Sequence, residues 1–233
     1  MKQWQATSRW LWIVLALAFL ARILAAMMLQ YQLDHVWKRD FFIPGDAEGY
    51  WELGKSIAAG QDYSVYDPPR RVLRMPGFPL VLSGSVALFG NSFFAARIVL
   101  AFFGTLGCAA VYLLGRELFN ERAALVGTAI AAAMPTFVLF SVVMLSESLF
   151  ALFMLLNLWA FAVFLRKCNS NASLASILCW AFIGGVLVTV ASYVRPSWIL
   201  VGFIFPAVWG ICRKFSRQAA LQGVVMIAGM IVS

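Results

Sequence analysis

Long runs of apolar residues are the feature that most restricts the fold of this chain. A helix that crosses a bilayer needs about 20 mostly apolar residues, and the sequence contains seven candidate spans. They are residues 10–30, 93–114, 123–140, 147–165, 174–193, 197–212 and 219–233. Charged residues make up only 12% of the chain, against roughly 25% in a soluble domain. The sequence therefore predicts an all-α polytopic membrane protein with about seven transmembrane helices.

One further apolar stretch, residues 77–90, is shorter than a bilayer is thick. If this stretch does not cross, nine cations at segment ends share one side of the membrane, whereas a crossing would move seven of the nine to the other side. These cations are Lys2, Arg9, Arg116, Arg122, Arg166, Lys167, Arg213, Lys214 and Arg217. The positive-inside rule therefore favours an interfacial or re-entrant helix at 77–90. It predicts a cytoplasmic N-terminus and a large extracytoplasmic loop, residues 31–92, in an inner or plasma membrane.

The most polar part of the chain is the segment 31–76, which holds seven of the ten acidic residues. Within it, the sequence Gly45-Asp46-Ala47-Glu48 opens a stretch that reads as a short helix. Under the predicted topology Glu147 and Arg195 reach the same side of the membrane. A bilayer protein that gathers its carboxylates on one face is expected to have its functional site there.

Each charged residue of this loop has two possible roles, one functional and one structural. The Asp46 carboxylate can act as a general base or hold a cation beside a phosphate, and its alternative role is the common one of capping a helix. Arg70, Arg71 and Arg74 suit bidentate contact with a lipid-linked phosphate. Their alternative role is loose attraction to anionic lipid headgroups.

Charges near or within the spans carry similar alternatives. Glu147 suits a paired site at a span end, or the first turn of a helix that Ser146 caps. Arg195 precedes a proline, and there it can snorkel to the surface or pair with a phosphate or carboxylate. Arg22 and Arg97 lie inside spans, so we expect each to snorkel or to find an acidic partner.

Several classes of site are excluded by residue type. His35 is the only histidine and no CxxC occurs, which argues against His-based zinc sites, Ser–His–Asp triads and thiolate metal sites. The net charge of +8 does not predict a nucleic-acid partner, because the cations lie at segment ends. No cofactor is predicted with certainty. A divalent cation, Mg²⁺ or Mn²⁺, stays open, with Asp46, Glu48 and Glu147 as its ligands.

Five segments in order resemble a known family. They are GDAEGYWELGKSIAAG, RMPGFPLVLSGSVALFG, ARIVLAFFGTLGCAAVYLLGRELF, MPTFVLFSVVMLSESLF and GGVLVTVASYVRPSW. Over roughly residues 10–210 the chain resembles the N-terminal half of GT-C fold membrane glycosyltransferases. It is most similar to the dolichyl-phosphate-mannose protein mannosyltransferase superfamily. The resemblance implies that residues 1–233 form a single transmembrane module and that the C-terminal part of the family is absent.

The resemblance also implies a reaction and roles for residues. It implies inverting transfer of a sugar from a polyprenyl-phosphate-linked donor to a protein, lipid or glycan acceptor at the extracytoplasmic face. Asp46 matches the position of the catalytic base, and Glu48 and Glu147 match acidic positions that would bind acceptor or cation. Arg195 matches an Arg-Pro turn of the family. Arg195 and Arg74, together with Arg70 and Arg71, would then hold the donor phosphate.

Two other functions remain open on the sequence. The first is a non-catalytic lipid-phosphate-binding or assembly subunit, or a truncated module that needs a partner membrane protein. The second is a transporter or flippase, which predicts ionisable residues near the middle of the membrane. The second is less favoured, because the acids lie outside the spans and only Arg22 lies well within one.

Overall fold

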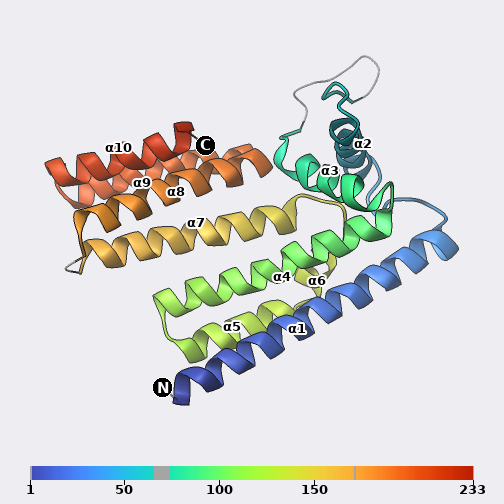
Figure 1. The fold of residues 1–233 in the computed structure, drawn as a ribbon, viewed down its shortest axis with the longest axis horizontal. Helices are drawn as coiled ribbons and strands as arrows, with labels where there is room; N and C mark the ends of the chain where they lie inside the picture. Colours follow the sequence, from blue (N-terminus) through green and yellow to red (C-terminus); the bar gives the residue numbers. More distant parts are fainter. Residues whose placement is uncertain (1, 66–73, 171, 233) are drawn as a thin grey trace.

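The computed structural model describes residues 2–65, 74–170 and 172–232, with side chains from residue 9 onward. The elements of these ranges are helices, arranged as a bundle of long rods with a smaller helical pair at one end (Figure 1). This confirms the predicted helical membrane protein. Arg70 and Arg71 lie outside the described residues.

Four helices are long and apolar enough to cross a membrane, by length and composition, within the described chain. The first spans Arg9–Trp37 and combines α1 (Lys2–Tyr31) with the π-helical turn η1 (Gln32–Trp37). The others are α4 (Phe93–Leu118), α7 (Glu147–Cys168) and α8 (Leu174–Val194). These four correspond to the first, second, fourth and fifth predicted spans.

The third predicted span is broken in the structure. Instead of one helix over 123–140, the chain forms α5 (Glu121–Ala133) and the short α6 (Pro135–Phe140). Met134 between them is extended, with φ −66° and ψ 118°. Proline has no amide hydrogen for the helix and disfavours the helical conformation of the residue before it, so the break falls at Met134.

The last two predicted spans are also short. Beyond the turn η2 (Pro196–Trp198), α9 covers Ile199–Cys212 and α10 covers Arg217–Val232. The described chain therefore has four helices of spanning length rather than the seven predicted. The predicted span 123–140 is two helices separated at Met134, and the predicted spans 197–212 and 219–233 correspond to single helices of 14 and 16 residues.

Glycines bring α8 and α10 into close contact. A Cβ added at Gly185 would lie 2.0 Å from the carbonyl oxygen of Met226, and one at Gly229 would lie 2.4 Å from that of Phe182. Two helices can approach this closely only where one of them lacks a side chain, as in many membrane interfaces. The α8–α10 pair is therefore packed backbone to backbone.

The helical pair at the end of the bundle consists of α2 (Asp46–Ala58) and α3 (Gly77–Phe89) (Figure 1). The two helices touch where Gly54 would place a Cβ 2.9 Å from that of Leu82. The start of α3 rests on the end of α8, because a Cβ at Gly77 would lie 2.7 Å from the carbonyl oxygen of Tyr193. The predicted short helix at 77–90 is thus confirmed as a separate helix, and it links α2 to α8.

The segment between α6 and α7, residues 141–146, is buried throughout, with no residue more than 7% exposed. Its apolar members belong to a core that also includes Trp51 of α2, Phe78 of α3, Leu100 of α4 and Val194 of α8. Non-helical backbone at this depth is tolerated where protein surrounds it. The loop therefore forms part of the core that supports α2 and α3 at this end of the molecule.

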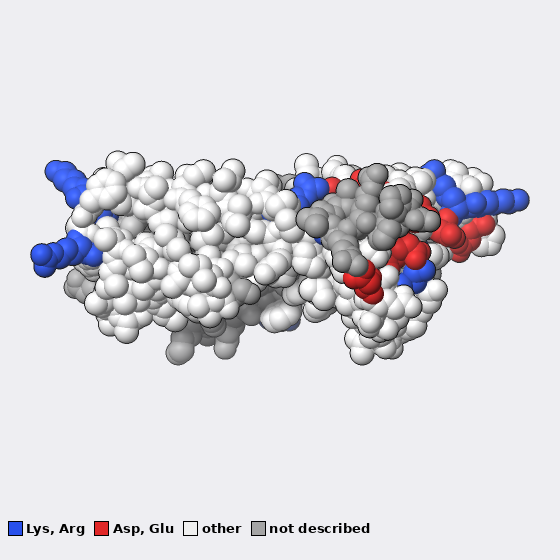
Figure 2. All heavy atoms as spheres, turned by 90° about the horizontal axis from the view of Figure 1, so that it is seen from above, with Lys and Arg blue, Asp and Glu red and all other residues white. Residues whose placement is uncertain are grey.

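Charges separate along the molecule. Figure 2 shows Lys and Arg at the end opposite α2 and α3, and Asp and Glu gathered with other basic residues at the α2–α3 end. The white surface between these ends carries little charge on the face shown. An uncharged belt between polar ends is what a bilayer requires of a protein that crosses it.

Candidate functional site

The first turn of α2 carries the carboxylate that the sequence singles out. Gly45 is the N-cap, with φ +85° and ψ −66°, and it makes no side-chain cap bond. A positive φ of this size favours glycine. Asp46 is therefore the first residue of the helix rather than its cap, so the simple capping role is wrong. Its position in the first turn favours a negative charge because of the helix dipole.

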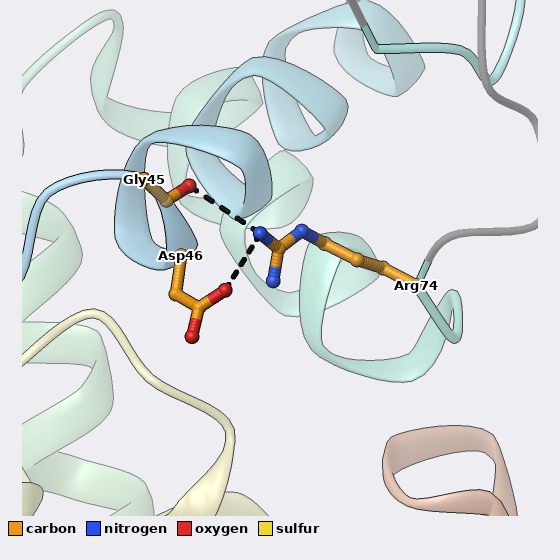
Figure 3. Close-up of polar contacts among 3 residues, drawn as sticks. All are labelled: Gly45, Asp46 and Arg74. Carbon is orange, nitrogen blue, oxygen red and sulfur yellow. Dashed lines mark hydrogen bonds and ion pairs between the residues drawn. The ribbon is translucent and has the colours of Figure 1, made fainter.

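Arg74 is the partner of Asp46. Its Nη2 lies 2.9 Å from Asp46 Oδ1 and donates to the carbonyl oxygen of Gly45 at 3.3 Å (Figure 3). The guanidinium carbon lies 4.4 Å from the centre of the Tyr50 ring, which adds a cation–π contact. The Arg74 side chain is 10% exposed and the Asp46 side chain 66% exposed. The cation is therefore held inside the site, while the carboxylate faces outward.

Two residues that sequence reasoning did not assign to the site fix the position of Arg74. A Cβ at Gly49 would lie 2.9 Å from Arg74 Nε, so the glycine makes room for the guanidinium. Tyr63 donates from its hydroxyl to the carbonyl oxygen of Arg74 at 2.9 Å. Burial, with a smaller contribution from Tyr50, raises the pKa of Tyr63, and Arg74 opposes this shift. In the sequence, the spacing of positions 46, 49 and 50 already indicated that Gly49 and Tyr50 share one face of the helix with Asp46.

A second carboxylate–arginine pair joins α7 to α8. Glu147, the first residue of α7, accepts from Arg195 Nη2 at 2.5 Å, and Arg195 is the C-cap that follows the last residue of α8. Arg195 is 42% exposed and Glu147 36%. Ser146 makes no side-chain cap bond to α7, so the predicted capping role of its hydroxyl is wrong. Of the alternatives left open for Arg195, the structure shows pairing with a carboxylate.

The two pairs lie at the same end of the molecule. Arg74 precedes by three residues the glycine that packs on Tyr193, and Arg195 follows Tyr193 by two. The contact between Gly77 and Tyr193 therefore connects the two arginines through a few residues of chain. The structure thus places Arg74, Asp46, Glu147 and Arg195 around the junction of α2, α3, α7 and α8.

Glu48 is not part of either pair. It lies exposed on α2 and forms no ion pair within the described residues. Nor do three or more His, Cys, Asp or Glu side chains gather into a group able to hold a metal ion anywhere in the described ranges. The ligand set of Asp46, Glu48 and Glu147 that the sequence left open for a divalent cation is therefore not assembled here.

Within the part of the chain that the structure describes, the arginines inside the spans neither snorkel nor pair directly with a carboxylate. Arg22 and Arg97 are each 1% exposed. Arg97 donates to the Gln30 side chain, which in turn donates to Asp34 at 2.8 Å. Arg22 contacts only neutral acceptors, among them Ser141 Oγ at 3.1 Å. The predicted outcomes are wrong for both residues, because protein rather than lipid or water surrounds them.

These features define the class of the protein: an integral membrane protein with carboxylate–arginine pairs at one end of a helical bundle. The family model described as dolichyl-phosphate-mannose-protein mannosyltransferase matches residues 69–233. The chain belongs to this family, and the resemblance seen in the sequence is confirmed. The match includes Arg74, Glu147 and Arg195 and begins after Asp46. None of the curated proteins compared with the chain matches it.

Proposed function

We propose that the chain transfers a sugar, with inversion, from a polyprenyl-phosphate-linked donor to an acceptor on the extracytoplasmic face. Family membership indicates a membrane glycosyltransferase of the mannosyltransferase type. The observation that carries the finer proposal is the Asp46–Arg74 pair: an open carboxylate 2.9 Å from an arginine that is almost buried. This transfer uses a base and a cation that binds phosphate, and the pair supplies one of each.

In the proposed reaction the donor phosphate replaces Asp46 as the partner of Arg74. The acceptor oxygen or nitrogen attacks the anomeric carbon from the face opposite the phosphate, and Asp46 takes its proton. The bond between the anomeric carbon and the phosphate oxygen breaks, and the polyprenyl phosphate leaves with the electron pair. Arg74 offsets the charge that develops on the leaving phosphate. Competition for Nη2 thus frees the carboxylate of Asp46 when the donor arrives.

The remaining charged residues complete the proposal. Arg195 would contact the donor phosphate together with Arg74, and Arg70 and Arg71 keep this proposed role from the sequence. Glu147 and Glu48 would bind the acceptor or a cation beside it. This role for Glu147 is supported by its second carboxylate oxygen, which is buried and has no hydrogen-bond partner among the described residues, while the first accepts from Arg195.

The proposed orientation follows the charges. The end with α2 and α3 would face the extracytoplasmic space, because the opposite end carries the Lys and Arg of the helix-connecting turns. In this orientation the broken helix α5–α6 and the short helices α9 and α10 would lie in the bilayer beside the four long helices. This arrangement would preserve the seven predicted membrane segments.

The proposal is tested by transfer in vesicles. The purified chain would be reconstituted with radiolabelled polyprenyl-phosphate sugars and a membrane extract as the source of acceptor. We expect transfer by the natural chain, loss of transfer in Asp46→Asn, and transfer close to normal in Glu52→Gln. Glu52 is the matched control, because it lies on the same helix and pairs with Lys55 at 2.9 Å. Unchanged turnover in Asp46→Asn would remove Asp46 from the role of base.

The same assay separates the alternative function. Both carboxylates of the site are already paired with arginines, an arrangement that a lipid-phosphate-binding subunit could also use. Such a subunit would bind the donor without transferring its sugar. Donor binding that depends on Arg74, with no transfer by the natural chain, would favour that function or a module that needs a partner.

A further inference from the structure

A cavity of about 430 Å³ lies within the bundle, between α1, α4, α5, α6 and α7. Its size falls in the range of small-molecule sites, roughly 300–1,000 Å³. Its walls are mainly apolar, with side chains such as Val111, Phe137, Phe140 and Met154. One fully buried charge, the guanidinium of Arg22, lies on this wall.

The hydrogen bonds of Arg22 all go to neutral acceptors. Nε donates to Ser141 Oγ at 3.1 Å, and Nη1 donates to the carbonyl oxygens of Ala18 at 3.0 Å and Ala132 at 3.5 Å. Nη2 donates only to the thiol of Cys108 at 3.3 Å, and sulfur is a weak acceptor. The guanidinium therefore has one nitrogen, Nη2, without a strong acceptor, and no carboxylate pairs with it in the described chain.

A buried charge without a counter-ion is costly inside a membrane-spanning helix. Glu147 also lines the cavity; Arg195 balances its charge through Oε1, while Oε2 is buried and has no hydrogen-bond partner among the described residues. Arg22 is thus the charge on the cavity wall that the described residues leave unbalanced. Its burial is explained if a ligand brings the missing negative charge.

Two glycines of α4 shape the site. A Cβ at Gly104 would lie 2.2 Å from Ser141 Oγ and 3.1 Å from Arg22 Nε, so this glycine lets the Arg22–Ser141 contact form. Gly107, about one turn further along α4, also lines the cavity, and a Cβ there would meet no atom within 4 Å. The first glycine supports the cation and the second leaves the space beside it open.

We propose that this cavity binds a single-chain amphiphile that ends in a carboxylate, with the carboxylate on Nη2 of Arg22 and the chain along the apolar wall. The planar guanidinium suits a carboxylate, and one positive charge balances one negative charge. A phosphate monoester would leave excess negative charge in the bundle. The apolar walls would leave the hydroxyls of a sugar phosphodiester without partners. The cavity includes neither Asp46 nor Arg74, and it shares Glu147 with the proposed transfer site. Binding of the amphiphile does not depend on the proposed transfer.

The test uses a long-chain polyene carboxylic acid, cis-parinaric acid, whose fluorescence rises on binding, and the alcohol of the same chain. Each would be titrated into the purified full chain in detergent micelles. We expect the acid to bind at least about tenfold more tightly than the alcohol, because only the acid forms a charge-assisted bond with Arg22. Dodecyl phosphate should displace the acid poorly.

Three variants make the result decisive. Gly107→Leu fills the cavity and should lower the affinity for the acid at least about tenfold. Gly84→Leu, on α3 and likewise in open space, should leave it unchanged. Arg22→Gln should abolish the difference between acid and alcohol; if that variant does not fold, the two glycine variants still decide. Equal binding of acid and alcohol by the natural chain, normal binding by Gly107→Leu, or stronger binding of dodecyl phosphate would each overturn the proposal.

Discussion

The sharpest test of the transfer site moves Arg74 without changing any charge. Replacing Gly49 by alanine places a Cβ 2.9 Å from Arg74 Nε and 3.0 Å from Nη2. Both atoms belong to the far end of a flexible side chain, so the guanidinium can swing aside while α2 stays in place. The substitution should therefore separate Arg74 from Asp46 and leave the fold intact.

The expected effects on stability and on transfer differ in size. Alanine in a helix interior is favoured over glycine by about 0.8–1.0 kcal/mol. Loss of the contact between Arg74 and Tyr50 would offset this gain by about 0.5–1 kcal/mol. The free energy of unfolding should therefore change by less than about 1 kcal/mol. A charge-assisted bond from Arg74 to the donor phosphate stabilises by about 1.5–3 kcal/mol, so its loss should slow transfer by about 10- to 150-fold.

The assay combines thermal unfolding with single-turnover transfer in vesicles. Gly84→Ala is the matched control, because the added Cβ meets no atom there and both measurements should stay near those of the natural chain. Arg74→Ala gives the transfer rate expected when the cation is absent. A Gly49→Ala protein that transfers at the natural rate, while Arg74→Ala does not, would show that the position of Arg74 beside Asp46 is unimportant.

Three further predictions concern the bundle and its orientation. Gly185→Ala forces a Cβ against the Met226 backbone and should destabilise the protein by about 1–3 kcal/mol, lowering Tm by about 2–12 °C; an unchanged Tm would show that α8 and α10 separate easily. Asn157 is fully buried and accepts from Trp198 Nε1 at 3.1 Å, so Asn157→Leu should cost about 1–3 kcal/mol in thermal unfolding. An unchanged free energy of unfolding in Asn157→Leu would contradict this contribution of the hydrogen bond to stability. Ser216→Cys, in a chain without its native cysteines, should react with a membrane-impermeant maleimide only after inside-out vesicles are prepared; labelling of intact cells would reverse the proposed orientation.

Long apolar segments could be predicted from the sequence, whereas breaks within them could not. The helices α1, α4, α7 and α8 each present an unbroken apolar run, so length and composition identify them. Pro135 interrupts the helix, but residues 123–140 are apolar enough as a whole to be predicted as one span. At Pro196, by contrast, one predicted span ends at residue 193 and the next begins at residue 197, and the structure has the turn η2 there.

Within the site, residue types could be predicted but their partners could not. Asp46 and Arg74 are separated by 28 residues, and nothing local to either one specifies the course of the chain between them. Gly49 and Tyr63 were missed because their roles depend on where Arg74 lies. Arg22 was misjudged for a similar reason: its partner Ser141 lies 119 residues away and belongs to a buried loop that hydropathy does not reveal.

That buried loop, residues 141–146, restricts how this protein can vary in evolution. It lies beneath α2 and α3 in the shared core, and its first residue also supports Arg22 at the cavity. An insertion there would disturb both places at once, since no part of the loop reaches solvent. The turns at 119–120 and 213–216, at the opposite end, are exposed to solvent and so can change in length more easily. Changes in length among relatives should therefore collect at that end and spare the end that carries the carboxylate–arginine pairs.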